Sequence, residues 1–342
     1  MDKAAASPEA ERRPHVVVSP MRLRMRATGE GGRKAYAEYA APAPAKRTLS
    51  GTSLESEPGP LTKLKKRCVL ADARGAQFGR PLVFEPTQQP CSAAIVWLHG
   101  FNDKPEWRAE HLAEVRAAHP RWKWIFLRAG RLPITCCKTG SRERYLPSWG
   151  DFLDPGTIHV GSQDHESADP GGWYAATATL VAGVLEALER DDGVPPSRVV
   201  LVGQSQGAAS AAHAALQHPR RLAGLVMLQG WLLPAARAAL TEPDRDEGEH
   251  RHAGLPVLVA HGTADKEVAY DCATLARRLL QKAGGALEFH SMPGVGHFLD
   301  KEEELDLQSK AVLFAERALG KKTRPLQRSG SSSTSLAEST EG

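Results

Sequence analysis

A serine flanked by small residues is the feature of this sequence that most directly suggests chemistry. Residues 203–207 read Gly-Gln-Ser-Gln-Gly and join an apolar run to an alanine-rich segment. In a strained strand-to-helix turn a serine is exposed, and small neighbours avoid clashes. A helix that starts just after Ser205 would direct N–H groups and its positive dipole end at a developing oxyanion. The alternative is a glycine-rich turn in which Ser205 only caps a helix.

An acid and a histidine that could activate Ser205 follow it in the chain. A nucleophilic serine needs a base, and the base needs a carboxylate that orients it. Asp265 follows an apolar run by a short turn, and His297 lies in the glycine-rich segment 293–298. The order serine, acid, histidine suits a nucleophile in this kind of turn. We therefore predict a catalytic triad with Ser205 as nucleophile, His297 as general base and Asp265 as orienting acid.

Other acids and histidines compete for these roles. The rival acids are Asp271, Asp300 and Glu302. The last two lie too close in sequence to His297 to be preferred. We expect His99 and His261, at the ends of apolar runs, to position loops by hydrogen bonds, and His290 to belong to a strand.

The second donor of an oxyanion hole is expected in the loop after an earlier strand. Residues 98–103 form such a segment behind the apolar run 93–98. We predict that the N–H groups of Phe101 and Gln206 together form the oxyanion hole. The alternative is that Phe101 is a core aromatic residue.

Short apolar runs, separated by helical patterns, must position these residues. Continuous runs of this kind favour parallel strands covered on both faces. The runs are 93–98, 124–127, 199–202, 225–228 and 256–260, with a last strand at 286–290. Residues 68–70 and 82–85 are expected to pair antiparallel at one edge. The alternation predicts an α/β fold with a mostly parallel, doubly wound sheet and helices on both faces.

Four helices are expected between and after these strands. Asp169-Pro170 is typical of an N-cap followed by proline at the first helical position. The other three helices are expected at 206–217, 271–282 and 301–319. Residues 241–254 are very polar and are expected to form a surface loop.

The charge of the chain is unevenly distributed. The 342 residues have a net charge of +4, but residues 1–66 carry +6 and 321–342 carry +2, which leaves −4 for 67–320. Both ends have too little apolar surface to offset the entropy of ordering. We therefore predict a disordered basic extension, one catalytic domain at 67–320, and a disordered Ser-rich tail.

This charge distribution argues against nucleic-acid binding, because the basic residues lie outside the acidic domain. The sequence has no zinc-ligand spacing, and we expect neither a metal nor an organic cofactor. No apolar run approaches the ~20 residues of a membrane helix. The five cysteines include an adjacent pair, which does not fit a disulfide framework. We predict a cytoplasmic location, with organelle targeting through the Arg-rich segment 21–26 as the alternative.

Six segments together resemble the acyl-protein thioesterase and lysophospholipase-like carboxylesterases of the α/β-hydrolase superfamily. The likeness spans residues 92–320 and rests on 98–103, 146–152, 203–207, 229–234, 261–265 and 296–297. It implies the α/β-hydrolase fold, the triad and oxyanion hole named above, and Trp149 as a substrate-binding residue near an acyl channel. It further implies hydrolysis of carboxylic esters, lysophospholipids or fatty thioesters, including depalmitoylation of S-acylated proteins.

The sequence departs from the family pattern around substrate access. Gly150 stands where the family usually has a bulky aromatic residue, and Asn102 where it usually has glycine. Val268-Ala269 replaces the usual Val-Pro, a change expected only to loosen a turn.

The expected reaction is hydrolysis through an acyl-enzyme on Ser205. The alternatives are an esterase for small soluble esters and a catalytically silent binding protein. The basic ends also suggest peripheral contact with an anionic membrane; the oligomeric state is not predicted.

Overall fold

The computed structural model describes residues 78–241 and 252–320. The predictions for the extension 1–66, the tail 321–342 and the strand at 68–70 fall outside the described residues, as does most of the loop at 241–254. Among the described helices, none is long and apolar enough to cross a membrane.

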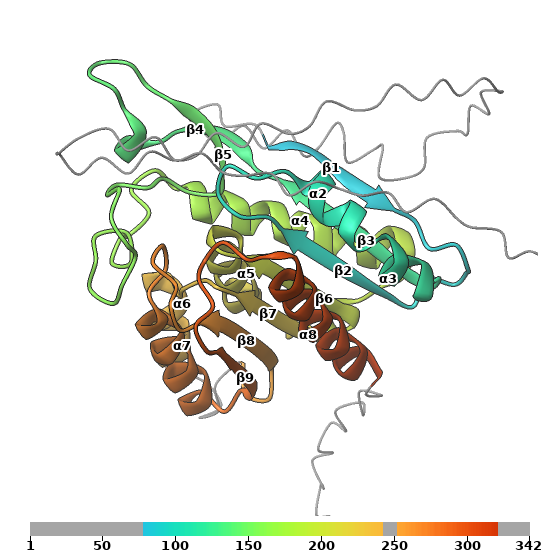
Figure 1. Ribbon diagram of the computed structural model, residues 1–342. Coiled ribbons are helices and arrows are strands. Elements are labelled where there is room, and N and C mark those ends of the chain that lie inside the picture. Colours follow the sequence, from blue (N-terminus) through green and yellow to red (C-terminus); the bar gives the residue numbers. More distant parts are fainter. Residues whose placement is uncertain (1–77, 242–251, 321–342) are drawn as a thin grey trace, which may run out of the picture. The chain divides into compact units, whose positions relative to one another are not determined.

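A seven-stranded sheet organises the described chain (Figure 1). Its strand order is β1-β3-β2-β6-β7-β8-β9. The strands are β1 (Gly79–Phe84), β2 (Ala93–Leu98), β3 (Trp122–Arg128), β6 (Val199–Gln204), β7 (Gly224–Leu228), β8 (Pro256–Gly262) and β9 (Ala286–Met292). All neighbouring pairs are parallel except β1 and β3. The predicted mostly parallel sheet is confirmed, and each predicted apolar run forms a strand.

Within the described residues, the antiparallel edge strand β1 pairs with β3. The register places Leu82 opposite Phe126 and Phe84 opposite Trp124. The partner expected from the sequence, residues 68–70, lies outside the described residues.

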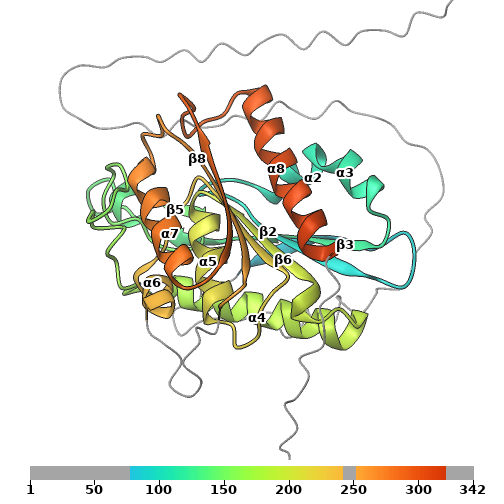
Figure 2. The ribbon, with the colours of Figure 1, turned by 90° about the horizontal axis from the view of Figure 1, so that it is seen from below.

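Helices cover both faces of the sheet (Figure 2). One face carries α4 (Trp173–Asp192), α5 (Gln206–Gln217), α6 (Pro234–Thr241) and α7 (Tyr270–Lys282). The other carries α2 (Pro105–His111), α3 (Ala113–Ala118) and α8 (Lys301–Gly320). Alternate residues of each strand enter two separate cores: Val96 and Leu201 contact the first group of helices, Trp97 and Val202 the second. The predicted coverage of both faces is confirmed.

The start of α4 differs from the prediction. The helix begins at Trp173, so Pro170 is not its first residue. The Asp169 carboxylate nevertheless accepts the N–H groups of Trp173, at 2.9 Å, and Ala175, at 3.0 Å. Asp169 therefore caps the helix although residues 170–172 separate it from Trp173. A sequence pattern in which the cap directly precedes the first helical residue misses this arrangement.

Several short elements were not predicted from the sequence. They are α2, α3, α6 and a hairpin of β4 (Gly130–Pro133) and β5 (Tyr145–Ser148). The hairpin stands at one end of the sheet (Figure 1). Its apolar side chains pack with Trp173, Phe101 and Phe152, which places it beside the predicted oxyanion loop.

Candidate active site

Ser205 occupies a sharp turn between β6 and α5. Its backbone has φ 53° and ψ −123°, a conformation that costs free energy for a residue with a side chain. A Cβ atom at Gly203 would collide with the backbone of Gly207, and one at Gly207 would collide with the carbonyls of Leu98 and His99. Both glycines are therefore required for the strand, turn and helix to pack. The strand-turn-helix context predicted for Ser205 is confirmed.

The structure brings Ser205, His297 and Asp265 together. The Ser205 hydroxyl lies 2.9 Å from Nε2 of His297, and Nδ1 of His297 lies 2.7 Å from Oδ2 of Asp265. Nδ1 therefore donates to the carboxylate, which leaves Nε2 as the acceptor for the serine proton. This is the geometry that a serine nucleophile needs from its base, and that a base needs from its orienting acid.

Asp265 is buried and kept ionised by its partners. Its Oδ1 accepts the N–H groups of Glu267 and Val268, both at 2.9 Å. Burial raises the pKa of the Asp265 carboxyl, but hydrogen bonds from His261 and His297 outweigh it, so this pKa lies well below its ordinary value. An ionised carboxylate at this position stabilises a cationic His297.

The loop that carries His297 is fixed from two sides. The side-chain amide of Gln229, the residue directly after β7, donates to the carbonyl of Gly296 at 2.6 Å. The same loop crosses so closely over Gly262 that a Cβ there would collide with the carbonyl of Val295. His297 is therefore held by contacts with two neighbouring strand ends.

His261 and His99 position loops, as predicted. Nε2 of His261 lies 2.8 Å from the carbonyl of Val268 and 3.3 Å from Asp265. His99 is buried, which lowers its pKa and keeps the ring neutral. Its Nδ1 donates to the carbonyl of Gly100 at 2.7 Å, and its Nε2 accepts the N–H of Ala129 at 3.1 Å.

The two predicted oxyanion donors lie on segments that meet at Ser205. Gln206 is the first residue of α5, so its N–H has no acceptor within the helix. A Cβ built on Gly100 would lie 3.6 Å from the Cβ of Ser205, which places the Phe101 turn beside the nucleophile. The Phe101 ring packs edge-on against Phe152, with centroids 4.9 Å apart.

Trp149 is a buried residue that connects two loops near the site. Its indole N–H donates to the carbonyl of His99 at 2.7 Å, and its ring packs against the His99 ring at 5.0 Å. Its backbone N–H donates to the side chain of Gln206 at 3.0 Å. The substrate-binding role of Trp149 stays a prediction; its contacts show that it ties the Gly100 turn to the start of α5.

Two departures from the family pattern have clear structural reasons. A Cβ at Gly150 would collide with the ring of Tyr174 on α4, so a larger residue does not fit beside Trp149. The N–H of Ala269 donates to the carbonyl of Ile158 at 2.7 Å, a bond that proline could not make. The expectation that Ala269 only loosens a turn is therefore wrong: this residue ties the segment around Ile158 to the loop that carries Asp265.

Two of the three rival acids have other partners. Oδ2 of Asp271 accepts the N–H of Val160 at 3.2 Å. Oδ1 of Asp300 accepts the N–H groups of Glu302 and Glu303 at the start of α8, each at 2.9 Å. Of the acids considered, only Asp265 bonds to His297.

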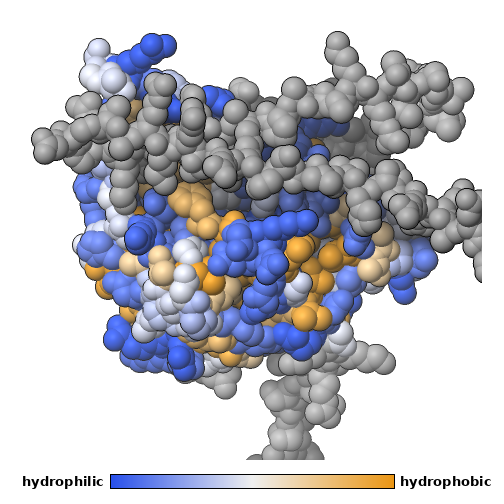
Figure 3. All heavy atoms as spheres, in the orientation of Figure 1, coloured by the Kyte–Doolittle hydropathy of each residue, from blue (hydrophilic) through white to orange (hydrophobic). Residues whose placement is uncertain are grey.

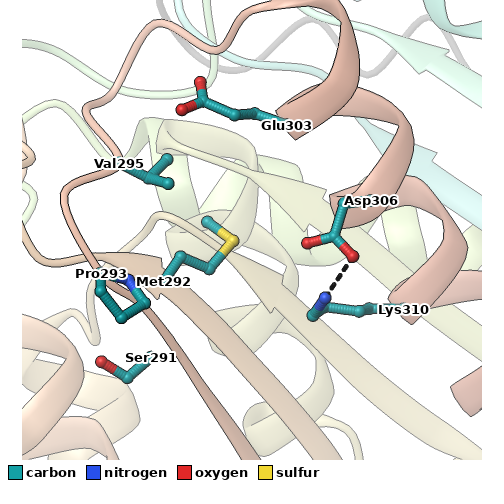
Figure 4. Close-up of a pocket in the computed structure, with 7 residues that line it drawn as sticks. All are labelled: Ser291, Met292, Pro293, Val295, Glu303, Asp306 and Lys310. Atoms are coloured by element: carbon teal, nitrogen blue, oxygen red, sulfur yellow. Dashed lines mark hydrogen bonds and ion pairs between the residues drawn. The ribbon is translucent and has the colours of Figure 1, made fainter.

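A pocket of about 280 Å³ lies between the end of β9 and α8 (Figure 4). Its lining residues are Ser291, Met292, Pro293, Val295, Glu303, Asp306 and Lys310. The carboxylates of Glu303 and Asp306 point from α8 toward the loop that follows β9 (Figure 4). Asp306 also pairs with Lys310. Ser205, Asp265 and His297 do not line this pocket, so it is separate from the site around Ser205.

Comparison with known proteins agrees with this architecture. Residues 80–310 match the family model described as Phospholipase/Carboxylesterase. A "Probable carboxylesterase" of Oryza sativa subsp. japonica is 30% identical over 220 residues, which cover 63% of this chain and 75% of that protein. Acyl-protein thioesterase 1 of Neurospora crassa is 29% identical over 234 residues, which cover 66% of this chain and 87% of that protein.

Solved structures show the same fold. The crystal structure of Arabidopsis thaliana SOBER1 is 26% identical, has a TM-score of 0.52, and matches 66% of this chain and 99% of its own. The family model alone spans more than half of the chain. This chain therefore belongs to the phospholipase/carboxylesterase family of ester hydrolases and has the α/β-hydrolase fold, as the motifs of its sequence predict.

Proposed function

We propose that the protein hydrolyses carboxylic esters and thioesters through an acyl-enzyme on Ser205. The observation that carries the proposal is the continuous hydrogen-bond chain from Ser205 through His297 to Asp265, with links of 2.9 Å and 2.7 Å. A silent binding protein of this fold would have no need to keep a serine in a strained turn at that distance from a histidine.

In the first step, the Ser205 oxygen attacks the acyl carbon while Nε2 of His297 takes the hydroxyl proton. The tetrahedral intermediate carries its negative charge on the former carbonyl oxygen. The N–H groups of Phe101 and Gln206 are assigned to stabilise that charge. Removing one such donor typically raises the barrier by about 3–4 kcal/mol. The charge on Asp265 stabilises the imidazolium form of His297 throughout this step.

The intermediate collapses when the bond to the leaving oxygen or sulfur breaks. His297 returns its proton to that atom, and the acyl group stays on Ser205. A water molecule then attacks the acyl carbon as His297 takes one of its protons. Release of the carboxylic acid returns the proton to Ser205, so the cycle needs no other reactant.

Ser205→Ala tests the assignment directly. We expect it to abolish turnover of a soluble p-nitrophenyl ester and covalent labelling by a fluorophosphonate, detected by mass spectrometry. Ser309→Ala, which removes an exposed hydroxyl on α8, is the control and should be labelled at the wild-type rate. Turnover or labelling of Ser205→Ala at the wild-type rate would show that another residue is the nucleophile.

Relatives support two substrate classes, since some are named carboxylesterases and others acyl-protein thioesterases. We propose long-chain acyl thioesters and lysophospholipids as the main class, with small soluble esters as the alternative. Initial rates on acyl esters and thioesters of increasing chain length separate the two. A long-chain thioester optimum supports the first class, and a two-carbon optimum supports the second.

Contact with a membrane and a cytoplasmic location stay predictions. The large apolar residues exposed in the described ranges are Trp107, Tyr145, Val160, Phe298, Leu305 and Leu313. Figure 3 shows apolar side chains on one face in separate patches, with hydrophilic residues between them. Vesicle sedimentation with anionic and neutral lipids tests the predicted contact of the basic ends.

A further inference from the structure

A buried arginine lies directly behind the turn that holds Ser205. Arg108, on α2, is only 2% exposed. One guanidinium nitrogen donates to the carboxylate of Glu304, on α8, and the other donates to the side-chain oxygen of Gln204. Gln204 is the last residue of β6 and immediately precedes Ser205.

The guanidinium is also held by its other neighbours. Its carbon lies 4.7 Å from the ring centre of Trp107 and 5.1 Å from that of Trp97. Its acceptor Glu304 is itself buried and accepts a hydrogen bond of 3.0 Å from the side chain of Gln308. A planar group that contacts two aromatic rings and donates to two acceptors has little freedom to move.

These contacts connect three segments that the proposed mechanism uses. α2 follows the turn with Phe101, Gln204 precedes Ser205, and α8 follows the loop with His297. The partners of Arg108 lie 96 and 196 residues away in sequence. One side chain thus fixes the relative positions of the segments that carry the oxyanion donor, the nucleophile and the base.

Stability alone is a weak reason to keep such a group. Burying an ion pair costs desolvation free energy that its attraction often only offsets, so apolar residues of similar volume do as well. Gln204 could equally be apolar if its side chain served only packing. Placement is a stronger reason, because a displacement of ~1 Å in a reacting group can lower the rate about 100-fold.

We propose that Arg108 is a positioning residue that holds the Ser205 turn in place through Gln204. It does not touch the reacting atoms; it acts through the hydrogen bond to Gln204 and the ion pair to Glu304. This inference rests on the proposed function of Ser205 and His297, and adds a residue to which no role in the reaction has been given.

The test compares Arg108 with a second buried cation. Lys123 is 1% exposed and bonds to Asp192 at 2.8 Å. It lies near the start of β3, whereas Ser205 follows the end of its own strand. Arg108→Met should lower kcat about 100-fold and leave KM for a p-nitrophenyl ester within about twofold. Lys123→Met should lower stability but leave kcat unchanged. Arg108→Lys should lose less than Arg108→Met, because lysine keeps the charge without the planar fork.

Gln204→Leu keeps the test decisive if Arg108→Met does not fold, because Gln204 is only half-buried. We expect it to lower kcat as well, and the double variant Arg108→Met/Gln204→Leu to lose no more than Arg108→Met alone. Wild-type kcat in Arg108→Lys and Gln204→Leu, or fully additive losses in the double variant, would overturn the positioning role. Ser205→Ala in the same assay distinguishes a failure of the positioning role from a failure of the proposed function. Its activity depends only on whether Ser205 is the nucleophile, and not on Arg108.

Discussion

The two ends of the parallel strands are built by different means; we call them the carboxyl edge, where the strands end, and the amino edge, where they begin. At the carboxyl edge, Asn102, Ser205 and Gln229 lie shortly after β2, β6 and β7 and all have positive φ. They are three of the four such non-glycine residues in the described ranges. At the amino edge, the backbone enters β3 in regular extended form, and the buried Lys123 pairs with Asp192. One edge uses strained backbone to aim side chains, whereas the other uses an ion pair to join elements.

The difference predicts different consequences of mutation. Strain persists only where the surrounding contacts impose it, and such places tend to serve function. Changes to Ser205, Asp265 or His297 at the carboxyl edge should therefore act mainly on rate, and changes at the amino edge mainly on stability.

The largest effect is expected from Asp265→Asn at the carboxyl edge. Asparagine keeps the volume of the side chain but loses its charge, and favours the wrong tautomer of His297. We expect kcat for a soluble ester to fall about 10⁴-fold, while the circular dichroism spectrum stays unchanged. A loss below tenfold in a folded protein would show that another group orients His297.

The matching change at the amino edge is Lys123→Met. It leaves the Asp192 carboxylate, 14% exposed, without the two hydrogen bonds it accepts from Lys123. We expect the free energy of unfolding to fall by about 3 kcal/mol, near the lower value for a broken buried pair. Urea unfolding measures this loss, and kcat at a temperature well below unfolding should not change. A fall in kcat would mean that the two edges are not separate in function.

The sequence predicts the carboxyl edge better than the rest of the chain. Continuous apolar runs identify β2, β6, β7 and β8, because strands covered on both faces tolerate few polar residues. The glycines around Ser205 and the order of Asp265 and His297 then predict that these three side chains meet at strand ends, and the structure has them within hydrogen-bond distance there. Local pattern suffices here because each group follows its strand by only a few residues.

Arg108 and the hairpin show what local pattern does not reveal. α2 and α3 have only seven and six residues, too few for a helical repeat to stand out. The strands of the hairpin have four residues each and contain proline, which argues against a strand. Arg108 resembles any exposed arginine in sequence, since both of its partners are brought to it only by the folded chain.

Acidification should lower the free energy of unfolding through Asp265, by a smaller amount than the changes above. Folding lowers the pKa of Asp265, so this carboxyl stabilises the folded state above its unfolded pKa of about 3.9, and the contribution is lost as the pH falls toward the folded pKa. From about pH 5 to pH 3, the free energy of unfolding of the wild type should therefore fall more steeply than that of Asp265→Asn. Parallel curves for the two proteins, measured by urea unfolding, would contradict the lowered pKa.

The smallest effect is expected at Asn102, where backbone strain can be measured without changing Ser205, Asp265 or His297. Its φ of 54° suits glycine, and its N–H donates to the carbonyl of Pro147 at 2.8 Å. Asn102→Ala should lower the free energy of unfolding by about 1–2 kcal/mol, because alanine enters the left-handed region less readily than asparagine. Asn102→Gly keeps the same backbone bond without a Cβ, and is expected to stay close to the wild type. If alanine and glycine are equally tolerated, the positive φ at this position stores no strain, and the contrast between the two edges would rest on Ser205 and Gln229 alone.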